Sequence, residues 1–137
     1  MTKNSKPTIQ VAAALIQQGD RYLIAQRLES VPLGGFWEFP GGKCGPGEGY
    51  EDCVRRELIE ELGVEVEIIG RDRLVEYVYP DQTVLLHFYR CRITSGEPQP
   101  LSCKQIRWAK IKELDQYRFP PANEPLIKEL MSKQGKP

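Results

Sequence analysis

The chain has 137 residues, enough for one hydrophobic core, so we expect a single domain over residues 1–137 with flexible ends at 1–7 and 133–137. Hydrophobic residues make up 40% and charged residues 28%, a globular composition that argues against intrinsic disorder. Nineteen basic residues balance nineteen acidic ones, and no apolar run approaches the ~20 residues that span a membrane, so the sequence predicts neither a nucleic-acid polymer nor a membrane as partner.

The four cysteines indicate a reducing compartment. They form no Cys-x-x-Cys pair, and His87 is the single histidine, so the spacing of a zinc site is absent. Residues 1–7 are basic but no apolar stretch follows them, so no secretory signal is visible. The sequence therefore predicts a cytoplasmic protein with four reduced thiols.

The first half of the chain reads as a hairpin followed by a glycine-rich loop. Apolar residues fill Ile9–Ile16, turn-forming residues follow at 17–20, and Arg21–Arg27 is apolar again, a pattern typical of a β-hairpin. Trp37–Phe39 predicts a short strand. Five glycines and two prolines between Pro40 and Gly49 predict a loop.

The clearest predicted element is a helix over Tyr50–Leu62. Val54, Leu58 and Leu62 recur every four residues and form one apolar stripe. Gly63 stands where a helix commonly ends in a left-handed residue.

The second half of the chain predicts strands and a last helix. Branched, aliphatic and aromatic residues indicate strands at 64–69, 74–79, 84–93 and 105–111, and His87 in the third of these is expected to be a packed or hydrogen-bonded imidazole. Pro125 opens a helical pattern that continues through Met131. The predicted fold class is therefore α+β.

Three carboxylates crowd one side of the predicted central helix. Glu57, Glu60 and Glu61 fall within a sector of ~100° beside the apolar stripe. Like charges at these spacings repel by a few tenths of a kcal/mol, about what one unfavourable pair costs a helix. A hard divalent cation such as Mg²⁺ or Mn²⁺ would relieve the repulsion, whereas a plain solvated face would simply tolerate it.

A longer pattern favours the cation. The sequence contains Gly-x5-Glu-x7-Arg-Glu-aliphatic-x-Glu-Glu-x-Gly-aliphatic, and with each fixed residue ~7% frequent a chance match is on the order of 10⁻⁷. The pattern consists of Gly42, Glu48, Arg56, Glu57, Leu58, Glu60, Glu61, Gly63 and Val64. It resembles the complete Nudix box, and the segments Trp37–Lys43 and Phe119–Pro125 are similar to the MutT-like branch of the Nudix hydrolases.

This resemblance implies an α/β/α sandwich around a central mixed β-sheet and a Mg²⁺-dependent enzyme in which Mn²⁺ can substitute. The metal ligands it implies are Glu57, Glu60, Glu61 and the Gly41 carbonyl, the three glutamates also being the catalytic residues. Glu57 could act as the general base or as a ligand. The residues it implies as supports of the box are Gly42, Glu48, Arg56 and Gly63, with Glu48 and Arg56 paired; a surface salt bridge is the alternative for that pair.

The reaction implied by the resemblance is hydrolysis of a nucleoside triphosphate to a monophosphate and pyrophosphate. The expected substrate is 8-oxo-dGTP or a similar damaged purine nucleotide, which would make the protein a DNA-repair enzyme that sanitises the nucleotide pool. The implied substrate-binding residues are Arg27, Glu38, Phe39, Pro40, Gly41, Ala122 and Asn123. Asn123 would read the base edge, because an amide can both donate and accept.

Several alternatives stay open. Asn123 is also a suitable N-cap for the helix that follows, and Arg27 could be an exposed strand-end cation. The substrate could instead be CTP, dCTP or another pyrimidine nucleotide, or the chain could sense nucleotides without turnover. MutT-like relatives usually carry a further acid before the strand around Trp108, but residues 101–105 hold none and Glu97 lies several residues earlier. The oligomeric state is left open between monomer and dimer.

Overall fold

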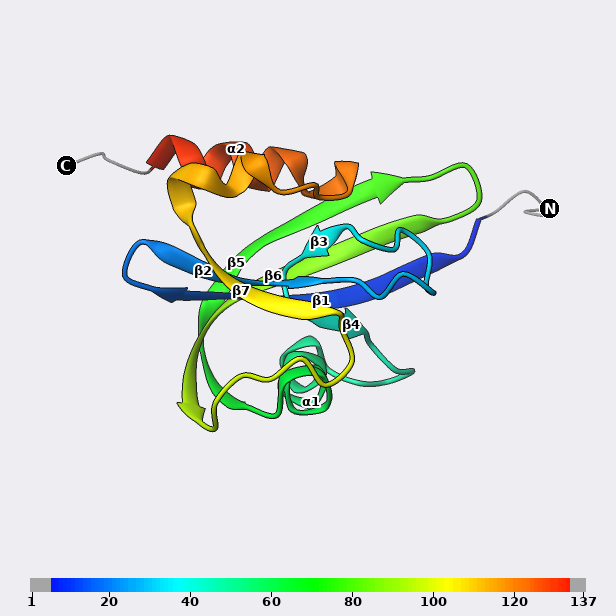
Figure 1. Ribbon diagram of the computed structural model, residues 1–137. Coiled ribbons are helices and arrows are strands. Elements are labelled where there is room, and N and C mark those ends of the chain that lie inside the picture. The colour runs from blue at the N-terminus through cyan, green and yellow to red at the C-terminus, as the bar shows by residue number, and fades with distance from the viewer. Residues whose placement is uncertain (1–5, 134–137) are drawn as a thin grey trace.

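The computed structural model describes residues 6–133, in which a central β-sheet lies between two helices. The helices α1 and α2 cover opposite faces of the sheet (Figure 1). This arrangement is the α/β/α sandwich that the resemblance implies. The elements are β1 (Thr8–Gln18), β2 (Arg21–Gln26), β3 (Trp37–Glu38), β4 (Gly41–Lys43), α1 (Tyr50–Leu62), β5 (Glu65–Val78), β6 (Thr83–Ser95), β7 (Gln105–Lys110), two 3₁₀ helices (Ile111–Gln116 and Pro121–Asn123) and α2 (Glu124–Lys133).

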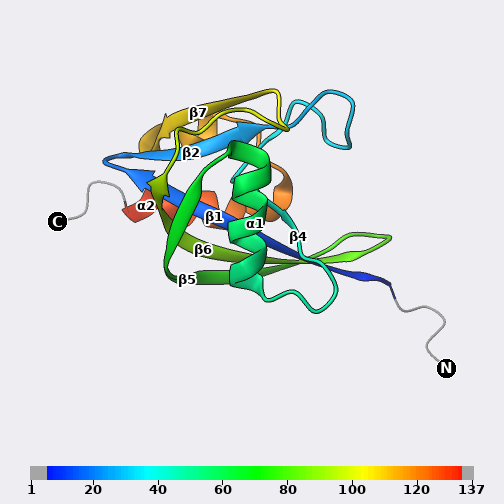
Figure 2. The same cartoon turned by 90° about the horizontal axis from the view of Figure 1, so that it is seen from below.

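The sheet is mixed, with strand order β3-β2-β1-β6-β5, and β4 and β7 pair with β1 and β2 respectively. The long pair β1–β6 is parallel, whereas the other pairs are antiparallel. The view from below shows α1 lying across the sheet beside β4 (Figure 2). The short strands β3 and β4 therefore bring the segment between them, Phe39 and Pro40, into the middle of the fold.

The strand β1 separates two hydrophobic cores. Ala12, Ala14 and Ile16 pack on the α1 side, whereas Ala13 and Leu15 pack on the α2 side. Successive side chains of a strand point to opposite faces, so a continuous apolar run is what a doubly covered strand requires.

The helix α1 matches its prediction at both ends. Val54, Leu58 and Leu62 are fully buried along its inner stripe. Gly63 ends the helix in the left-handed region at φ 72°, and its N–H donates to the Ile59 carbonyl at 3.0 Å. Glu57, Glu60 and Glu61 lie between these stripe residues in the sequence, so their positions relative to the sheet are fixed as well.

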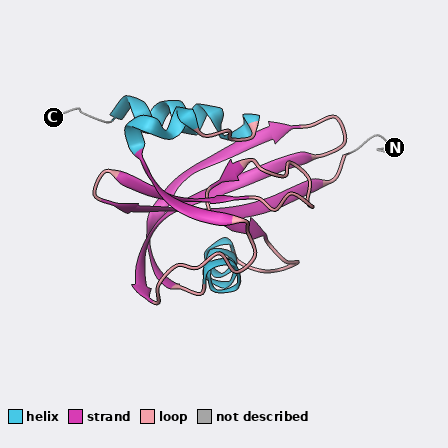
Figure 3. Cartoon of the chain, in the orientation of Figure 1, coloured by secondary structure: helices cyan, strands magenta, loops and turns pink. Residues whose placement is uncertain are grey.

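Two predicted boundaries are wrong, for reasons of pairing. The segment Pro40–Gly49 is not all loop, because Gly41–Lys43 pairs antiparallel with β1 (Figure 3). The strands predicted at 64–69 and 74–79 are one continuous strand, β5, in which shifts of register between Ile68 and Arg73 absorb the polar interruption.

The structure describes only part of the two chain ends that we expected to be flexible. Most of the segments expected to be flexible, 1–5 and 134–137, lie outside the described residues, whereas Pro7 accepts a hydrogen bond from the Thr83 N–H at 2.9 Å.

His87 is buried and hydrogen-bonded, as predicted: Gln10 Oε1 lies 2.7 Å from its Nε2 and Arg71 Nη2 lies 2.9 Å from its Nδ1. Because arginine only donates, Nδ1 accepts and Nε2 carries the proton. None of the helices described between residues 6 and 133 is long and apolar enough to cross a membrane.

Candidate functional site

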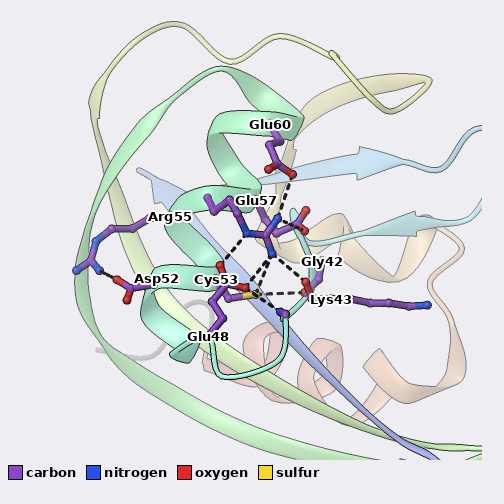
Figure 4. A network of polar contacts seen from close by, with 10 residues as sticks. Gly42, Lys43, Glu48, Asp52, Cys53, Arg55, Glu57 and Glu60 are labelled. Carbon is purple, nitrogen blue, oxygen red and sulfur yellow. Dashed lines mark hydrogen bonds and ion pairs between the residues drawn. The ribbon is translucent and has the colours of Figure 1, made fainter.

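A network of polar contacts joins the glycine-rich loop to α1 (Figure 4), and Arg56 makes most of them. Arg56 binds Glu48 with two donors, Nε to Oε2 at 2.7 Å and Nη2 to Oε1 at 3.0 Å. Its Nη1 also donates to Glu57 at 3.0 Å and to Glu60 at 3.1 Å. Its Nη2 reaches the Lys43 carbonyl at 3.0 Å. The expected Glu48–Arg56 pair is thus present, at the centre of a network rather than as an isolated surface ion pair.

We expect Glu48→Gln to destabilise the protein at neutral pH, and by less as the pH falls. Hydrogen bonds from Arg56 and from the Gly45 N–H lower the pKa of Glu48 from 4.5 to about 2. A depressed carboxyl pKa contributes stability that is complete above 4.5 and is lost towards pH 2. Urea unfolding of both proteins at several pH values should therefore show midpoints that differ at pH 7 and converge on acidification.

The matched control for this change is Glu51→Gln, three residues later in the sequence and paired with Arg55 at 3.6 Å. Both partners are exposed, so the substitution should hardly move the unfolding midpoint. A gap between Glu48→Gln and wild type that stayed constant from pH 7 down to pH 3 would show that charge is not what Glu48 contributes.

Glu57 is wedged between the helix and the glycine-rich segment. A Cβ atom on Gly42 would overlap the Glu57 carboxyl group, so only glycine leaves room for this side chain. The Glu57 side chain is 18% exposed, and burial raises its pKa, helped by the Glu60 charge and opposed by Arg56. A carboxylate that has a raised pKa and is still partly exposed to water suits proton transfer.

Glu61 occupies the most unusual environment on α1. It is 8% exposed, and its Oε1 atom has no hydrogen-bond partner among the described residues. Burial raises its pKa to about 8, and the negative charges of Glu38 and Glu57 add to that effect. The three glutamates that the sequence places in one sector thus differ sharply: Glu60 is exposed, Glu57 is half-buried and Glu61 is buried.

Glu61 lines a cavity of about 340 Å³ that opens beside β3 and β4. This volume lies at the lower end of small-molecule sites, which hold about 300–1,000 Å³. Its wall combines charged groups near Glu61 with apolar side chains from β1 and β6. The predicted site residues that line it are Arg27, Glu38, Phe39, Gly41, Gly42, Glu61, Ala122 and Asn123.

Glu57, Glu60 and Pro40 are predicted site residues that do not line the cavity. Glu57 lies against Gly42, which does line it, whereas Glu60 is exposed, and Arg56 donates a hydrogen bond to each glutamate. Pro40 is fully buried, and its carbonyl accepts a hydrogen bond from the Ala14 N–H at 2.8 Å. Pro40 therefore positions the segment around it rather than facing the cavity.

Arg27 and Glu38 form an ion pair at the cavity wall. Arg27 Nη1 donates to Glu38 Oε1 at 3.0 Å, and its Nε donates to the Pro32 carbonyl at 2.8 Å. The two side chains are 29% and 26% exposed, so Arg27 is not the free strand-end cation of the alternative interpretation. Burial raises the pKa of Glu38, and Arg27 opposes that rise.

Asn123 faces the cavity from the opposite side. It is 8% exposed and closes a 3₁₀ turn in which its N–H donates to the Pro120 carbonyl at 2.9 Å. The helix α2 begins at the next residue, but no side-chain hydrogen bond from Asn123 to α2 is found in the described part of the chain. The amide is thus not used as an N-cap and is available to a ligand. Phe39 and Ala122 are buried beside it, and Phe39 stacks on Phe119 with ring centroids 5.4 Å apart.

Sequence reasoning missed part of the cavity wall. Tyr79, Val84, Leu86 and Phe88 line it from the β5–β6 hairpin, and alternation along β6 was the available signal. The loop 101–105 contributes Ser102 and Cys103, not an acid. Burial, with the nearby charges of Glu61 and Glu38, raises the pKa of Cys103 to about 11, so this loop is uncharged where it faces the cavity.

The carboxylate oxygens of the site are ligands that suit a hard divalent cation, although most of these carboxylates form ion pairs with arginines in this structure. Within residues 6–133, no three His, Cys, Asp or Glu side chains are grouped so that they could hold a metal ion as they lie. Arg56 holds Glu57 and Glu60, and Arg27 holds Glu38. The unpaired oxygen of buried Glu61 is nevertheless an anionic donor of the kind that Mg²⁺ and Mn²⁺ prefer.

Comparison with known proteins matches residues 11–129 to the family model described as NUDIX domain. The 8-oxo-dGTP diphosphatase of Haemophilus influenzae is 36% identical over 129 residues, covering 93% of this chain and 94% of that protein. The CTP pyrophosphohydrolase of Escherichia coli is 34% identical over 130 residues, covering 90% and 92%. The solution structure of the E. coli ORF135 protein superposes with a TM-score of 0.80 at 30% identity, over 96% of this chain and 94% of that one.

Proposed function

The chain belongs to the NUDIX domain family and is a Nudix hydrolase, and from that premise we propose that it hydrolyses 8-oxo-dGTP or a similar damaged purine nucleoside triphosphate. The products are the monophosphate and pyrophosphate: a water oxygen bonds to phosphorus as the phosphoanhydride bond breaks. This reaction removes a damaged precursor of DNA from the nucleotide pool. We place it in the cytoplasm, in keeping with the absence of disulfides among the described cysteines.

The observation that carries the proposal is the unpaired Oε1 of Glu61 beside a cavity of suitable size. Nudix hydrolases generally use divalent metal ions, and we propose Mg²⁺, with Mn²⁺ able to replace it. Glu57, Glu60, Glu61 and the Gly41 carbonyl would hold the ion. When bound, it supplies positive charge opposite the phosphate oxygens and makes water more acidic.

The chain's own residues would divide the remaining work. Glu57 accepts the proton of the attacking water, a role that its raised pKa favours. Arg27 contacts the phosphates, since a guanidinium can bind two phosphate oxygens at once. Asn123 hydrogen-bonds the base edge beside Phe39 and Ala122, which also line the cavity.

A pyrimidine triphosphate is the second candidate substrate. The CTP pyrophosphohydrolase of E. coli is nearly as similar to this chain as the 8-oxo-dGTP diphosphatases are. The resemblance of the segment Phe119–Pro125, which contains Asn123, to the MutT-like branch favours the purine.

A nucleotide panel tests the proposal directly. Pyrophosphate release should be fastest with 8-oxo-dGTP, slower with dGTP, CTP and dCTP, and abolished when EDTA replaces Mg²⁺. Faster release from CTP or dCTP would assign the second candidate. Release from none of these nucleotides in Mg²⁺ or Mn²⁺ would refute the proposed reaction.

Because Gly42 makes room for Glu57, we expect Gly42→Ala to slow turnover by about 10²-fold, the size of effect that follows a small displacement of a reacting group. Steady-state kinetics with the best nucleotide of the panel measure it. Gly45→Ala is the matched control, since a Cβ there meets Glu48 only at an ordinary 3.7 Å. Equal rates in the two variants would show that the position of Glu57 is unimportant.

A further inference from the structure

Two carboxylates line the cavity within the described residues, and they come from different elements. Glu61 projects from α1 and Glu38 from β3. Glu61 Oε1 is buried and unpaired, which costs about 1–3 kcal/mol or more for a polar group. Positive charge placed between the two acids would remove that cost.

Glu38 is fixed in place by its strand. It pairs with Ala25 of β2, and its Oε1 accepts the Arg27 hydrogen bond at 3.0 Å. In the described part of the chain, no hydrogen bond to its Oε2 is found. One oxygen of Glu38 is therefore available at the same cavity wall as Glu61.

No other part of the cavity wall can supply an anion. The loop 101–105 presents a hydroxyl and a thiol there, and Glu97 does not line the cavity. Arg27 is the positive group that currently balances Glu38. Among the residues that line the cavity, Glu38 therefore offers the second carboxylate to a cation that binds Glu61.

We propose that Glu38 is a ligand of the divalent cation together with Glu61, and that Arg27 and the cation compete for the Glu38 carboxylate. Because both positive groups draw on the charge of one carboxylate, a cation at Oε2 weakens the hold of Oε1 on Arg27, and Arg27 is then free to contact a phosphate. Cation binding would thus prepare the arginine for the substrate. This inference rests on the proposed function only in taking the protein to bind a divalent cation.

Mn²⁺ binding without nucleotide tests the proposal. Free Mn²⁺ is followed by electron paramagnetic resonance at one fixed pH, with circular dichroism to confirm folding. Glu38→Gln should weaken binding by at least about tenfold, more than the loss of a supporting residue. Glu97→Gln, the same change at an exposed acid outside the cavity, should leave binding unchanged.

The proposed competition also predicts that removing Arg27 has the opposite effect on Mn²⁺ affinity to removing Glu38. Arg27→Gln should tighten Mn²⁺ binding in the wild type but have little effect in the Glu38→Gln background, because the two side chains act on one another. Equal tightening in both backgrounds, or wild-type affinity in Glu38→Gln, would overturn the proposal. If Glu38→Gln does not fold, unchanged affinity in Arg27→Gln overturns it instead. Absence of Mn²⁺ binding in the wild type would refute the cation site itself, and only that outcome would also remove the proposed function.

Discussion

Glu57→Gln should lower turnover of the preferred nucleotide by about 10²–10⁴-fold, the range for loss of a positioned general base. Glutamine keeps the shape of the side chain and can still contact Arg56, but it accepts no proton. Glu57 is wedged against Gly42 by a close approach that glutamine would preserve. Folding and nucleotide binding should therefore survive while the chemical step does not. Single-turnover kinetics separate the chemical step from product release.

Glu51→Gln provides the control for this result. Glu51 lies in the first turn of the same helix, is exposed and pairs with Arg55, so turnover should be unchanged. Nucleotide affinity of the Glu57 variant, measured by equilibrium binding, should stay near that of the wild type. If Glu57→Gln turned over as fast as the wild type, proton transfer would have to be assigned to another residue, such as the buried Glu61 four residues further along α1.

The parts of the fold that were predictable are those that local sequence dictates. Helix α1 ends where its apolar stripe meets Gly63, because a glycine can adopt the left-handed conformation that stops a helix. The alternation of β1 between two cores follows from a run of small and aliphatic residues. The contact between Glu48 and Arg56 was implied by the resemblance to the Nudix box, and it is present in the structure.

The parts that were not predictable depend on contacts between distant segments. Gly41–Lys43 pairs with β1 because glycine lets two backbones approach: a Cβ on Gly41 would overlap the Ala12 carbonyl. Glu61 is buried and lines one cavity with Glu38 of β3 and with Cys103, whereas Glu60 is exposed. Nothing in the sequence near a helix reveals which carboxylate a remote strand will cover, so three equivalent acids became three different ones.

Asn123→Ala should reduce the preference for 8-oxo-dGTP over dGTP by about tenfold or more, because a paired donor and acceptor at a base edge is worth about 1–3 kcal/mol of discrimination. The side chain is buried at the cavity and makes no capping hydrogen bond in the described part of the chain, so the free energy of unfolding should fall by less than about 1 kcal/mol. The ratio of kcat/KM values for the two nucleotides measures the preference, and urea unfolding measures stability.

Two further variants decide what the amide does. Asn123→Asp keeps an acceptor but loses the donor, so it should lose selectivity as well if both functions of the amide are read by the base. Glu124→Ala changes the exposed residue that begins α2 and should leave selectivity intact, since it does not line the cavity. A loss of stability in Asn123→Ala with unchanged selectivity would mean that the side chain serves the start of α2 after all. The base would then have to be recognised through the backbone around Phe39 and the apolar wall of β6.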